Sequence, residues 1–414
     1  MSKRVLIISQ NYYPEIGSAA NRIKNIYLEL TERGHKVTVL TTEPSYPNKN
    51  LYKDAKFWQD GELERDVIRI RTRTRRYSNN IFKRLQLYME MTYKFVRTIH
   101  RLKDDYDYII ATTPAIFVGL AGLLAKRRLS CPLVLDVRDL WPDSLLGVGV
   151  FTFKPVIAMA RALENKLYAE SEHIIVNSEG FRPHIKRRGI PDSRISFMPN
   201  SLTESELFGT VKVASSEEAV TVIYTGNIGL AQDLDQLIEI AQRLKDRKDI
   251  KFKIIGYGYR SKELRSRIEM LGLTNVELLK AENRSDATRA VREADIAFVS
   301  LVRQPVFDTV LPGKIIDYMS MGKPIVGSVS GYAAEVLEQS EAGFAARDRS
   351  TDDLQCYITQ LASDVTLRRT MGSNGYQYAC RHYRWKDNIM VLADVLEKEY
   401  GKENRHVRLE PLYK

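Results

Sequence analysis

The sequence predicts an α/β protein built from two Rossmann-like, doubly wound domains that face each other across a cleft. Three observations lead to this fold class. Short runs rich in Val, Ile and Leu alternate with longer helical patterns along almost the whole chain. Most of these runs are continuously apolar, as expected of strands that are buried on both faces of a parallel sheet. The alternation pauses once, near the middle of the chain, and then resumes.

In the first half of the chain, the expected strands are short apolar runs separated by helical patterns. These strands are residues 5–9, 36–41, 67–72, 108–112, 133–137 and 174–177. Residues 21–33 and 81–103 are expected to be helical, because their apolar residues recur every three or four positions. The second half repeats this rhythm, with expected helices at 234–247 and 261–271. Its expected strands are residues 220–225, 251–255, 276–279, 296–300 and 324–329.

A polar stretch between Pro199 and Glu218 separates the two halves. We place the domain boundary there, with an N-terminal domain of residues 1–200 and a C-terminal domain of residues 201–385. The length of 414 residues agrees with more than one domain. Residues 401–414 form a polar tail that we expect to be loosely attached.

The composition excludes several broad classes. Apolar residues make up 44% of the chain and charged residues 28%, which argues against wholesale disorder and against a bundle of membrane spans. The longest apolar stretch, residues 115–125, is well short of the roughly 20 residues that span a bilayer, and we interpret it as a buried helix. Three cysteines in so long a chain, none in a C-x-x-C pair, cannot form a disulfide framework, and such sparse cysteine is typical of a reducing compartment. With only a short apolar run near the N-terminus, we expect a cytoplasmic protein.

The net charge of +11 is concentrated between residues 65 and 103. Twelve Lys and Arg residues stand there against only Asp66 and Glu90. The cations that an expected strand and the following helix would present are Arg69, Arg71, Arg73, Arg75, Lys83 and Arg84. A solvated face, an anionic membrane contact and a nucleic-acid contact all remain open on charge alone, although no nucleic-acid-binding motif accompanies the charge.

Motifs of several enzyme classes do not occur in the sequence. H-E-x-x-H, G-x-S-x-G and the Walker A sequence are missing, and the histidines lack metal-ligand spacing, so we expect no metal site. Gly256-Tyr257-Gly258 follows an expected strand, but Ser261 stands where a dinucleotide fingerprint needs a glycine.

Polar loops with glycines or charges follow four expected strands. In the first half, Gly17 lies in a strand-to-helix turn that would let an anion approach a helix N-terminus. Arg138 and Asp139 follow the strand at 133–137, where open α/β sheets bind ligands. In the second half, Asn227-Ile228-Gly229 and Gly256 stand at strand ends and outline a cleft rim. Tight turns, or a structural Arg–Asp pair within residues 135–143, are the alternatives.

The strongest pattern lies between Phe307 and Val326. Pro312 and Gly313 precede a short helix that carries Lys314 and Asp317 on one face, three residues apart. A lysine near a helix start could reach a diphosphate, and an aspartate one turn later could accept hydrogen bonds from ribose hydroxyls. The alternative is an exposed ion pair between these two residues.

At these residues, the sequence resembles the retaining, nucleotide-sugar-dependent glycosyltransferases of family 4, which have the two-domain GT-B fold. The resemblance covers nearly the whole chain. It is closest to the bacterial branch that includes N-acetylfucosaminyl transferases of surface-polysaccharide assembly. The motifs that carry it are Asp-x-Arg-Asp-Leu-Trp-Pro at 136–142, Gly-Asn-x-Gly at 226–229 and Pro-x-Lys-x-x-Asp-Tyr-Met at 312–319.

The resemblance implies an acceptor-binding N-terminal domain, a donor-binding C-terminal domain and a helix at 386–400 that packs back onto the first domain. Residues implied to bind the donor are Gly17, Asn227, Gly229, Gly256, Thr309, Lys314 and Asp317. Of these, Lys314 would lie near the diphosphate and would also serve catalysis, and Asp317 would hold the ribose. Arg138 and Asp139 would contact the acceptor or the transferred sugar. No metal or other cofactor is implied, because basic side chains and helix N-termini meet the charge of the leaving diphosphate.

Five positions depart from the pattern of the family. Thr309 and Asp317 stand where the family often has two glutamates. Arg138 stands where many members have a histidine, and Asn227 and Gln232 stand where many have an Arg/Lys pair. These departures bear on how the transferred sugar is held.

The function that the resemblance implies is transfer of an N-acetylhexosamine-type sugar from UDP to a polyprenyl-diphosphate-linked acceptor at the cytoplasmic membrane face. The basic stretch would dock the enzyme to anionic lipid or to the diphosphate of the acceptor. One alternative is an epimerase or a phosphorylase of the same fold. Another is a non-catalytic protein that binds anionic lipid or nucleic acid. Nucleoside diphosphate released only in the presence of acceptor would exclude an epimerase, and loss of donor binding in Lys314→Ala would exclude the non-catalytic protein.

Overall fold

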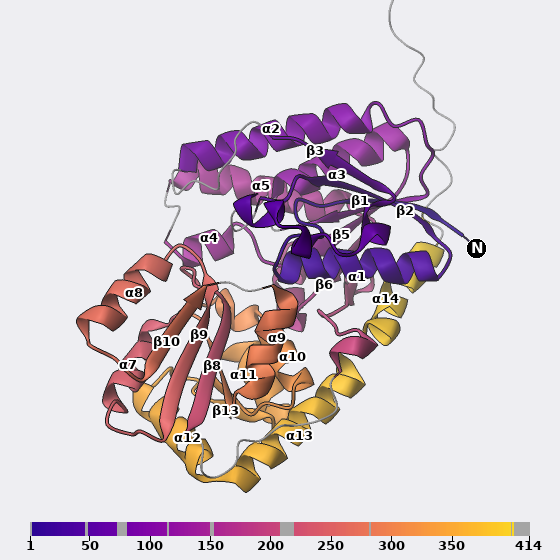
Figure 1. The fold of residues 1–414 in the computed structure, drawn as a ribbon. Helices are drawn as coiled ribbons and strands as arrows, with labels where there is room; N and C mark the ends of the chain where they lie inside the picture. Colours follow the sequence, from indigo (N-terminus) through magenta and orange to yellow (C-terminus); the bar gives the residue numbers. More distant parts are fainter. Residues whose placement is uncertain are drawn as a thin grey trace, which may run out of the picture.

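The computed structural model describes residues 2–45, 49–72, 81–113, 116–149, 153–207, 219–280, 283–398 and 400. In this part of the chain, two parallel sheets form, and helices cover both faces of each (Figure 1). The α/β class and the two Rossmann-like domains predicted from the sequence are confirmed.

The N-terminal sheet has the strand order β3-β2-β1-β4-β5-β6-β7, and every neighbouring pair is parallel. Its strands are β1 (Arg4–Ile8), β2 (Lys36–Thr42), β3 (Val67–Ile70), β4 (Tyr108–Thr112), β5 (Leu133–Val137), β6 (His173–Val176) and β7 (Ile195–Phe197). The order reverses between β1 and β4. Loops that follow these two strands therefore diverge and leave a crevice where ligands bind in doubly wound sheets.

Side chains of β1 alternate between two apolar cores, one on each face of this sheet. Leu6 and Ile8 pack with α2 (Ile81–Ile99), α3 (Ile116–Leu129) and α5 (Lys154–Glu170). Val5 and Ile7 pack with α1 (Ser18–Glu32) and α14 (Trp385–Glu397). The last helix of the described chain thus packs beside α1 on the N-terminal domain (Figure 1).

The C-terminal sheet has the order β10-β9-β8-β11-β12-β13, again all parallel. Its strands are β8 (Val220–Asn227), β9 (Ile250–Tyr257), β10 (Val276–Lys280), β11 (Ile296–Ser300), β12 (Ile325–Ser328) and β13 (Gly343–Ala345). One face is covered by α7 (Asp235–Arg243), α8 (Ser261–Met270) and α12 (Thr351–Ser363). The other is covered by α9 (Arg284–Glu293), α10 (Gly313–Ser320), α11 (Gly331–Gln339) and α13 (Val365–His382).

Short helical segments connect these layers. They are η1 (Lys49–Lys53), η2 (Ala55–Phe57), η3 (Gly61–Glu64), α4 (Asp143–Gly147), η4 (Glu179–Phe181), α6 (Arg182–Arg187), η5 (Asp192–Arg194), η6 (Glu204–Glu206) and η7 (Phe307–Thr309). The two crossovers between the domains pair with each other. The Leu202 amide donates to the Tyr383 carbonyl at 2.9 Å, and the Trp385 amide donates to the Leu202 carbonyl at 3.0 Å. The domains are therefore joined by two adjacent chain segments.

Most predicted strands agree with the structure within one or two residues, and the differences have physical causes. The strands β7 and β13 were not predicted because each has only three residues. The predicted strand at 67–72 was wrong at its end, since β3 stops at Ile70, and the predicted helix 81–103 stops at Ile99. β8 and β9 run further than predicted because the glycines near their ends let the backbones of the two strands approach each other closely. A Cβ on Gly256 would lie 2.1 Å from the Gly226 carbonyl oxygen.

Candidate active site

The N-termini of α1 and α10 meet between the two domains. Gly17 precedes α1 with φ +130°, a conformation that favours glycine, and a Cβ there would lie 3.8 Å from the Tyr257 hydroxyl. A Cβ on Gly313, the first residue of α10, would lie 3.2 Å from the Ser18 hydroxyl and 3.4 Å from the Asn200 amide nitrogen. Helix N-termini carry partial positive charge. Their convergence makes a position suited to an anion.

Lys314 is the second residue of α10, and its amine has no hydrogen-bond partner among the described residues. Its Nζ atom is shielded from solvent and lies 3.7 Å from the centre of the Tyr224 ring. A Cβ on Gly226 would lie 3.7 Å from the same atom. Removal from water lowers the pKa of Lys314 to about 7, although Asp317 acts in the opposite direction. The amine therefore has the Asp317 charge nearby but no hydrogen-bond acceptor among the described residues, and an anionic ligand can supply that acceptor.

Asp317 forms its ion pair with Arg284, the first residue of α9, at 3.0 Å. The exposed Lys314–Asp317 pair that the sequence left open is not the arrangement observed. Arg284 also contacts Glu206 of η6 at 2.7 Å. Burial raises the pKa of Asp317 above its ordinary value, and Arg284 opposes this shift. Sequence reasoning missed Arg284, because an arginine at the start of a polar helix carries no distinguishing signal.

The loops after β8 and β9 fit together through their glycines. A Cβ on Gly258 would lie 2.2 Å from the Ile228 carbonyl oxygen. The Gly229 amide donates to the Gln232 side-chain oxygen at 3.2 Å, and the Asn227 side-chain amide donates to the same oxygen at 3.4 Å. Asn227, Gly229 and Gly256 therefore lie in one compact rim next to Tyr257.

The side chains of η7 are engaged within the C-terminal domain. The Thr309 hydroxyl donates to the Val306 carbonyl at 2.6 Å. The Asp308 carboxylate accepts a hydrogen bond from the Ser330 hydroxyl and pairs with Arg349 at 3.4 Å. Where the family often has a glutamate, this chain thus has a hydroxyl that bonds within its own turn.

Arg138 and Asp139 follow β5 on the N-terminal side of the cleft, and each has its own partners. The Arg138 Nε donates to the Thr112 hydroxyl at 2.7 Å and lies 3.9 Å from the Asp136 carboxylate. Removal from water lowers the pKa of Arg138 to about 10, which leaves it charged at neutral pH. Burial raises the pKa of Asp139 to about 6, although hydrogen bonds from Ser144 and the Leu140 amide oppose the shift.

Beneath this loop lies a buried ion pair that the sequence analysis missed. Both Arg22 and Asp136 are almost fully buried, and their closest nitrogen and oxygen are 2.8 Å apart. Arg22 also donates to the Pro199 carbonyl at 3.0 Å, at the crossover between the domains. A signal was available, because Arg22 precedes Ile26 and Leu30 at helical spacing on the apolar face of α1.

Both domains of the chain match known protein families. Residues 17–201 match the glycosyl transferase 4-like domain, and residues 210–378 match the glycosyl transferases group 1 family. The chain belongs to the GT-B glycosyltransferases. The family resemblance stated from the sequence is confirmed at this level, and the narrower N-acetylfucosaminyl branch stays a prediction.

Individual relatives of this glycosyltransferase are distant in sequence. WcaI of Escherichia coli (strain K12), a glycosyl transferase assigned to colanic acid biosynthesis, is 23% identical over 346 residues, which cover 80% of this chain and 84% of WcaI. The uncharacterized glycosyltransferase MJ1178 of Methanocaldococcus jannaschii is 21% identical and covers 94% of this chain and 96% of its own length. The crystal structure of Anabaena HepE in complex with UDP and glucose superposes with a TM-score of 0.69 at 18% identity, covering 96% of this chain and all of HepE.

The basic residues that were predicted to dock this glycosyltransferase occupy different environments. Arg69 contacts Glu64 and the Tyr13 carbonyl, and Arg71 pairs with Glu43 at 2.6 Å. β3 ends at Ile70, so Arg71 lies beyond the strand, and Arg73 and Arg75 lie outside the described residues. Lys83 and Arg84 lie in the first turn of α2, and their side chains are outside the description.

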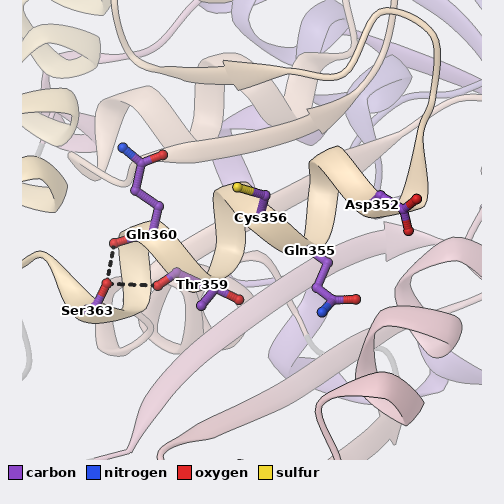
Figure 2. Close-up of a pocket in the computed structure, with 6 residues that line it drawn as sticks. All are labelled: Asp352, Gln355, Cys356, Thr359, Gln360 and Ser363. Carbon is purple, nitrogen blue, oxygen red and sulfur yellow. Dashed lines mark hydrogen bonds between the residues drawn. The ribbon is translucent and has the colours of Figure 1, made fainter.

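A surface hollow on the C-terminal domain lies away from the cleft. Its lining residues are Asp352, Gln355, Cys356, Thr359, Gln360 and Ser363, all from α12 (Figure 2). This helix packs on α7 and α13, at the end of the C-terminal domain remote from the N-terminal domain (Figure 1). The hollow therefore does not belong to the site described above.

The described residues contain neither a cluster of metal-binding side chains nor a helix that could span a membrane. No group of three His, Cys, Asp or Glu side chains in this part of the chain is arranged to hold a metal ion. Likewise, none of the helices described here combines the length and the apolar character needed to cross a bilayer.

Proposed function

We propose that this glycosyltransferase moves an N-acetylhexosamine-type sugar from UDP to a polyprenyl-diphosphate-linked saccharide, with retention of configuration, at the cytoplasmic face of the membrane. The observation that carries the proposal is the buried Lys314 amine, without a hydrogen-bond partner among the described residues, in the first turn of the helix α10 whose N-terminus meets that of α1. Solved complexes of the similar Anabaena protein contain UDP and UDP-glucose, which supports a UDP-linked donor. The relation to WcaI supports a role in surface-polysaccharide assembly, of which the N-acetylfucosaminyl branch is one example.

In this proposal the donor diphosphate lies between the two helix N-termini. Lys314 would contact its phosphate oxygens, next to Gly17 and the rim of Asn227 and Gly229. Asp317 would accept hydrogen bonds from the ribose while it keeps or exchanges its contact with Arg284. The helix ends and the lysine would together balance the charge of the leaving UDP, so that no metal ion is needed.

The chemical step exchanges one bond at the anomeric carbon for another. The bond between this carbon and the diphosphate oxygen breaks, and a bond to the acceptor hydroxyl oxygen forms on the same face of the sugar. The acceptor proton passes to the leaving phosphate, which is consistent with the lack of a dedicated base in our assignment. Arg138 and Asp139 would position the acceptor or the sugar from the N-terminal side of the cleft. Closure of the domains would exclude water and suppress hydrolysis of the donor.

Thermal unfolding with UDP, GDP, ADP, CMP or dTDP, each with and without EDTA, tests the donor assignment. UDP at 100 times its dissociation constant should stabilise the fold by about 2.7 kcal/mol, and EDTA should leave the shift unchanged. A shift with another nucleotide alone would overturn the UDP assignment, and a shift lost with EDTA would overturn metal independence. Nucleoside diphosphate released from the donor without any acceptor would contradict transfer and favour a hydrolase, whereas a changed nucleotide sugar without release of nucleoside diphosphate would favour an epimerase.

The outer helices of the N-terminal domain supply the surface that we propose for membrane docking. Arg97 of α2 and Lys154 of α5 are exposed cations on this surface. Large apolar side chains that are more than 60% exposed beside them are Met89, Tyr93, Phe153 and Met159. An apolar side chain that enters the lipid interface contributes through the hydrophobic effect, and each nearby cation contributes about 1 kcal/mol on an anionic surface. Both terms act together only on an anionic bilayer, which is the partner we propose.

Co-sedimentation with phosphatidylglycerol vesicles and with neutral phosphatidylcholine vesicles tests this docking. Phe153→Ser/Met159→Ser should lower binding to the anionic vesicles about tenfold, because roughly 1.4 kcal/mol of apolar transfer is lost. Met270→Ser is the matched control, since Met270 is 79% exposed on α8 of the other domain. Equal binding of both variants, or equal binding to the two kinds of vesicle, would contradict the proposal.

A further inference from the structure

Three glycines make room for η7, which lies between β11 and α10. A Cβ on Gly147 of α4 would lie 2.8 Å from Val306, and one on Gly180 of η4 would lie 2.4 Å from the Thr309 carbonyl oxygen. A Cβ on Gly331 would lie 2.1 Å from the Asp308 carbonyl oxygen. Real Cβ atoms do not approach backbone atoms so closely. Because Gly147 and Gly180 belong to the N-terminal domain, the two domains fit together here only in the absence of side chains.

A buried hydrogen bond fixes the same contact. The Ser178 hydroxyl, at the end of β6, donates to the Thr309 carbonyl at 2.6 Å, and Ser178 is only 1% exposed. Val306 and Val310, on either side of η7, pack against the apolar cores of both domains. Polar and apolar contacts thus join η7 and its flanking residues to the N-terminal domain.

This contact bears on the site because η7 leads directly into α10. Only residues 310–312 separate the two segments, and α10 begins at Gly313, next to Lys314. Holding η7 therefore holds the N-terminus of α10 opposite that of α1. We propose that Ser178 and Gly180 are positioning residues that lock the two domains in the arrangement competent for transfer. The effect on transfer rests on the proposed function, whereas the effect on domain arrangement does not.

Two pairs of variants separate this role from general damage to the fold. Ser178→Ala removes the interdomain hydrogen bond, and Ser171→Ala is its matched control. Ser171 is also 1% exposed and also donates to a backbone carbonyl at 2.6 Å, but within its own domain. Gly180→Val adds a side chain against η7, and Gly61→Val is its control, because a Cβ on Gly61 meets nothing within 4 Å.

Small-angle scattering of the full chain measures the domain arrangement, UDP titration measures donor binding, and UDP release with donor and acceptor measures transfer. Ser178→Ala and Gly180→Val should each show a larger radius of gyration than their controls. In both variants kcat should fall at least about fivefold, because the loss of one hydrogen bond costs roughly 1 kcal/mol. The UDP dissociation constant should change less than about threefold.

Three results would overturn the inference. The first is wild-type scattering in both Ser178→Ala and Gly180→Val. The second is an unchanged kcat in both despite altered scattering. The third is a loss of UDP binding equal to the loss of kcat, which would mean that the variants damage the donor site itself. If wild-type protein binds no UDP, the proposed donor fails, and the scattering comparison still decides whether Ser178 and Gly180 hold the domains.

Discussion

Replacing Lys314 with methionine should abolish donor binding and, at the same time, stabilise the free protein. The amine is shielded from solvent and lacks a hydrogen-bond partner among the described residues, an arrangement that costs about 1–3 kcal/mol. Methionine has a similar length and carries no polar group that needs a partner. Urea unfolding should therefore show a higher midpoint for Lys314→Met, whereas calorimetric titration with the UDP-sugar should show no binding.

Lys323 provides the matched control for this substitution. It is only 1% exposed, but its amine donates to the Arg292 carbonyl at 2.7 Å and to the Ala294 carbonyl at 2.6 Å. Lys323→Met should therefore destabilise the protein and leave the UDP-sugar affinity of the folded fraction unchanged. If Lys314→Met is destabilised as strongly as Lys323→Met, the amine is a structural group, and its assignment to the diphosphate is wrong.

The same lysine should make donor affinity depend on pH. In the free protein the pKa of Lys314 is lowered to about 7 by removal from water, and a bound diphosphate should raise it again. The affinity is then fully present below about pH 7. It falls by up to about tenfold per pH unit above that value, until the pKa of the complex is reached. A UDP-sugar is the right probe, because the terminal phosphate of free UDP would itself titrate near pH 6.

The stability of the free protein should change in the opposite direction. Unfolded chains carry Lys314 with its ordinary pKa near 10.5, so between about pH 7 and that value they bind more protons than the native state. Wild-type stability relative to Lys314→Met should therefore rise with pH over this range. A UDP-sugar affinity that stays constant from about pH 6 to about pH 9 in the wild type would contradict both statements.

Removing one partner of the buried Arg22–Asp136 pair should give the largest loss of stability. Arg22→Met removes the closest cation from the buried Asp136 carboxylate and leaves it Arg138 at 3.9 Å, and loss of one partner of a buried pair typically costs about 3–5 kcal/mol. Arg22→Met/Asp136→Leu removes both charges and should recover more than half of this loss, because apolar replacements of a buried pair are often neutral. Recovery will be incomplete, since the Pro199 carbonyl loses its donor in either variant. Urea unfolding of the single and the double variant measures the loss of stability and its recovery.

An exposed pair in the same domain is the control for this cycle. Arg127 pairs with Glu170 at 3.1 Å, and both side chains are substantially exposed. Arg127→Met should therefore cost less than about 1 kcal/mol. A double variant no more stable than Arg22→Met alone would mean that Arg22 stabilises the fold through Pro199 and the crossover rather than through Asp136.

Local patterns in the sequence accounted for most of the fold. Continuous apolar runs marked β1, β4, β5, β8 and β11, because a strand buried on both faces needs apolar residues at every position. The predicted domain boundary rested on the polar stretch between the halves, in which Leu202 is nevertheless a buried core residue. The three-residue strands β7 and β13 escaped notice, because so short a segment shows no periodicity.

The candidate site was predictable only in part. Gly17, Asn227, Gly256 and Lys314 could be selected from the sequence, because glycines and polar residues after buried strands collect at one edge of a parallel sheet. The sequence did not show which of these side chains would lack a hydrogen-bond partner. That Lys314 is unpaired and that Asp317 binds Arg284 depends on where α9 lies, and this is decided by packing around a separate strand.

By itself, the sequence determined the fold class, the two domains and the strand ends at which the residues proposed to bind the donor gather. These features depend on hydrophobic spacing over a few residues. Only the tertiary structure decided that Arg22 pairs with Asp136, that Ser178 bonds to Thr309, and that Gly180 faces η7 across the domain boundary. Each of these contacts joins segments that are far apart in the chain. They exist because two sheets and two crossovers bring those segments together, which no local pattern encodes.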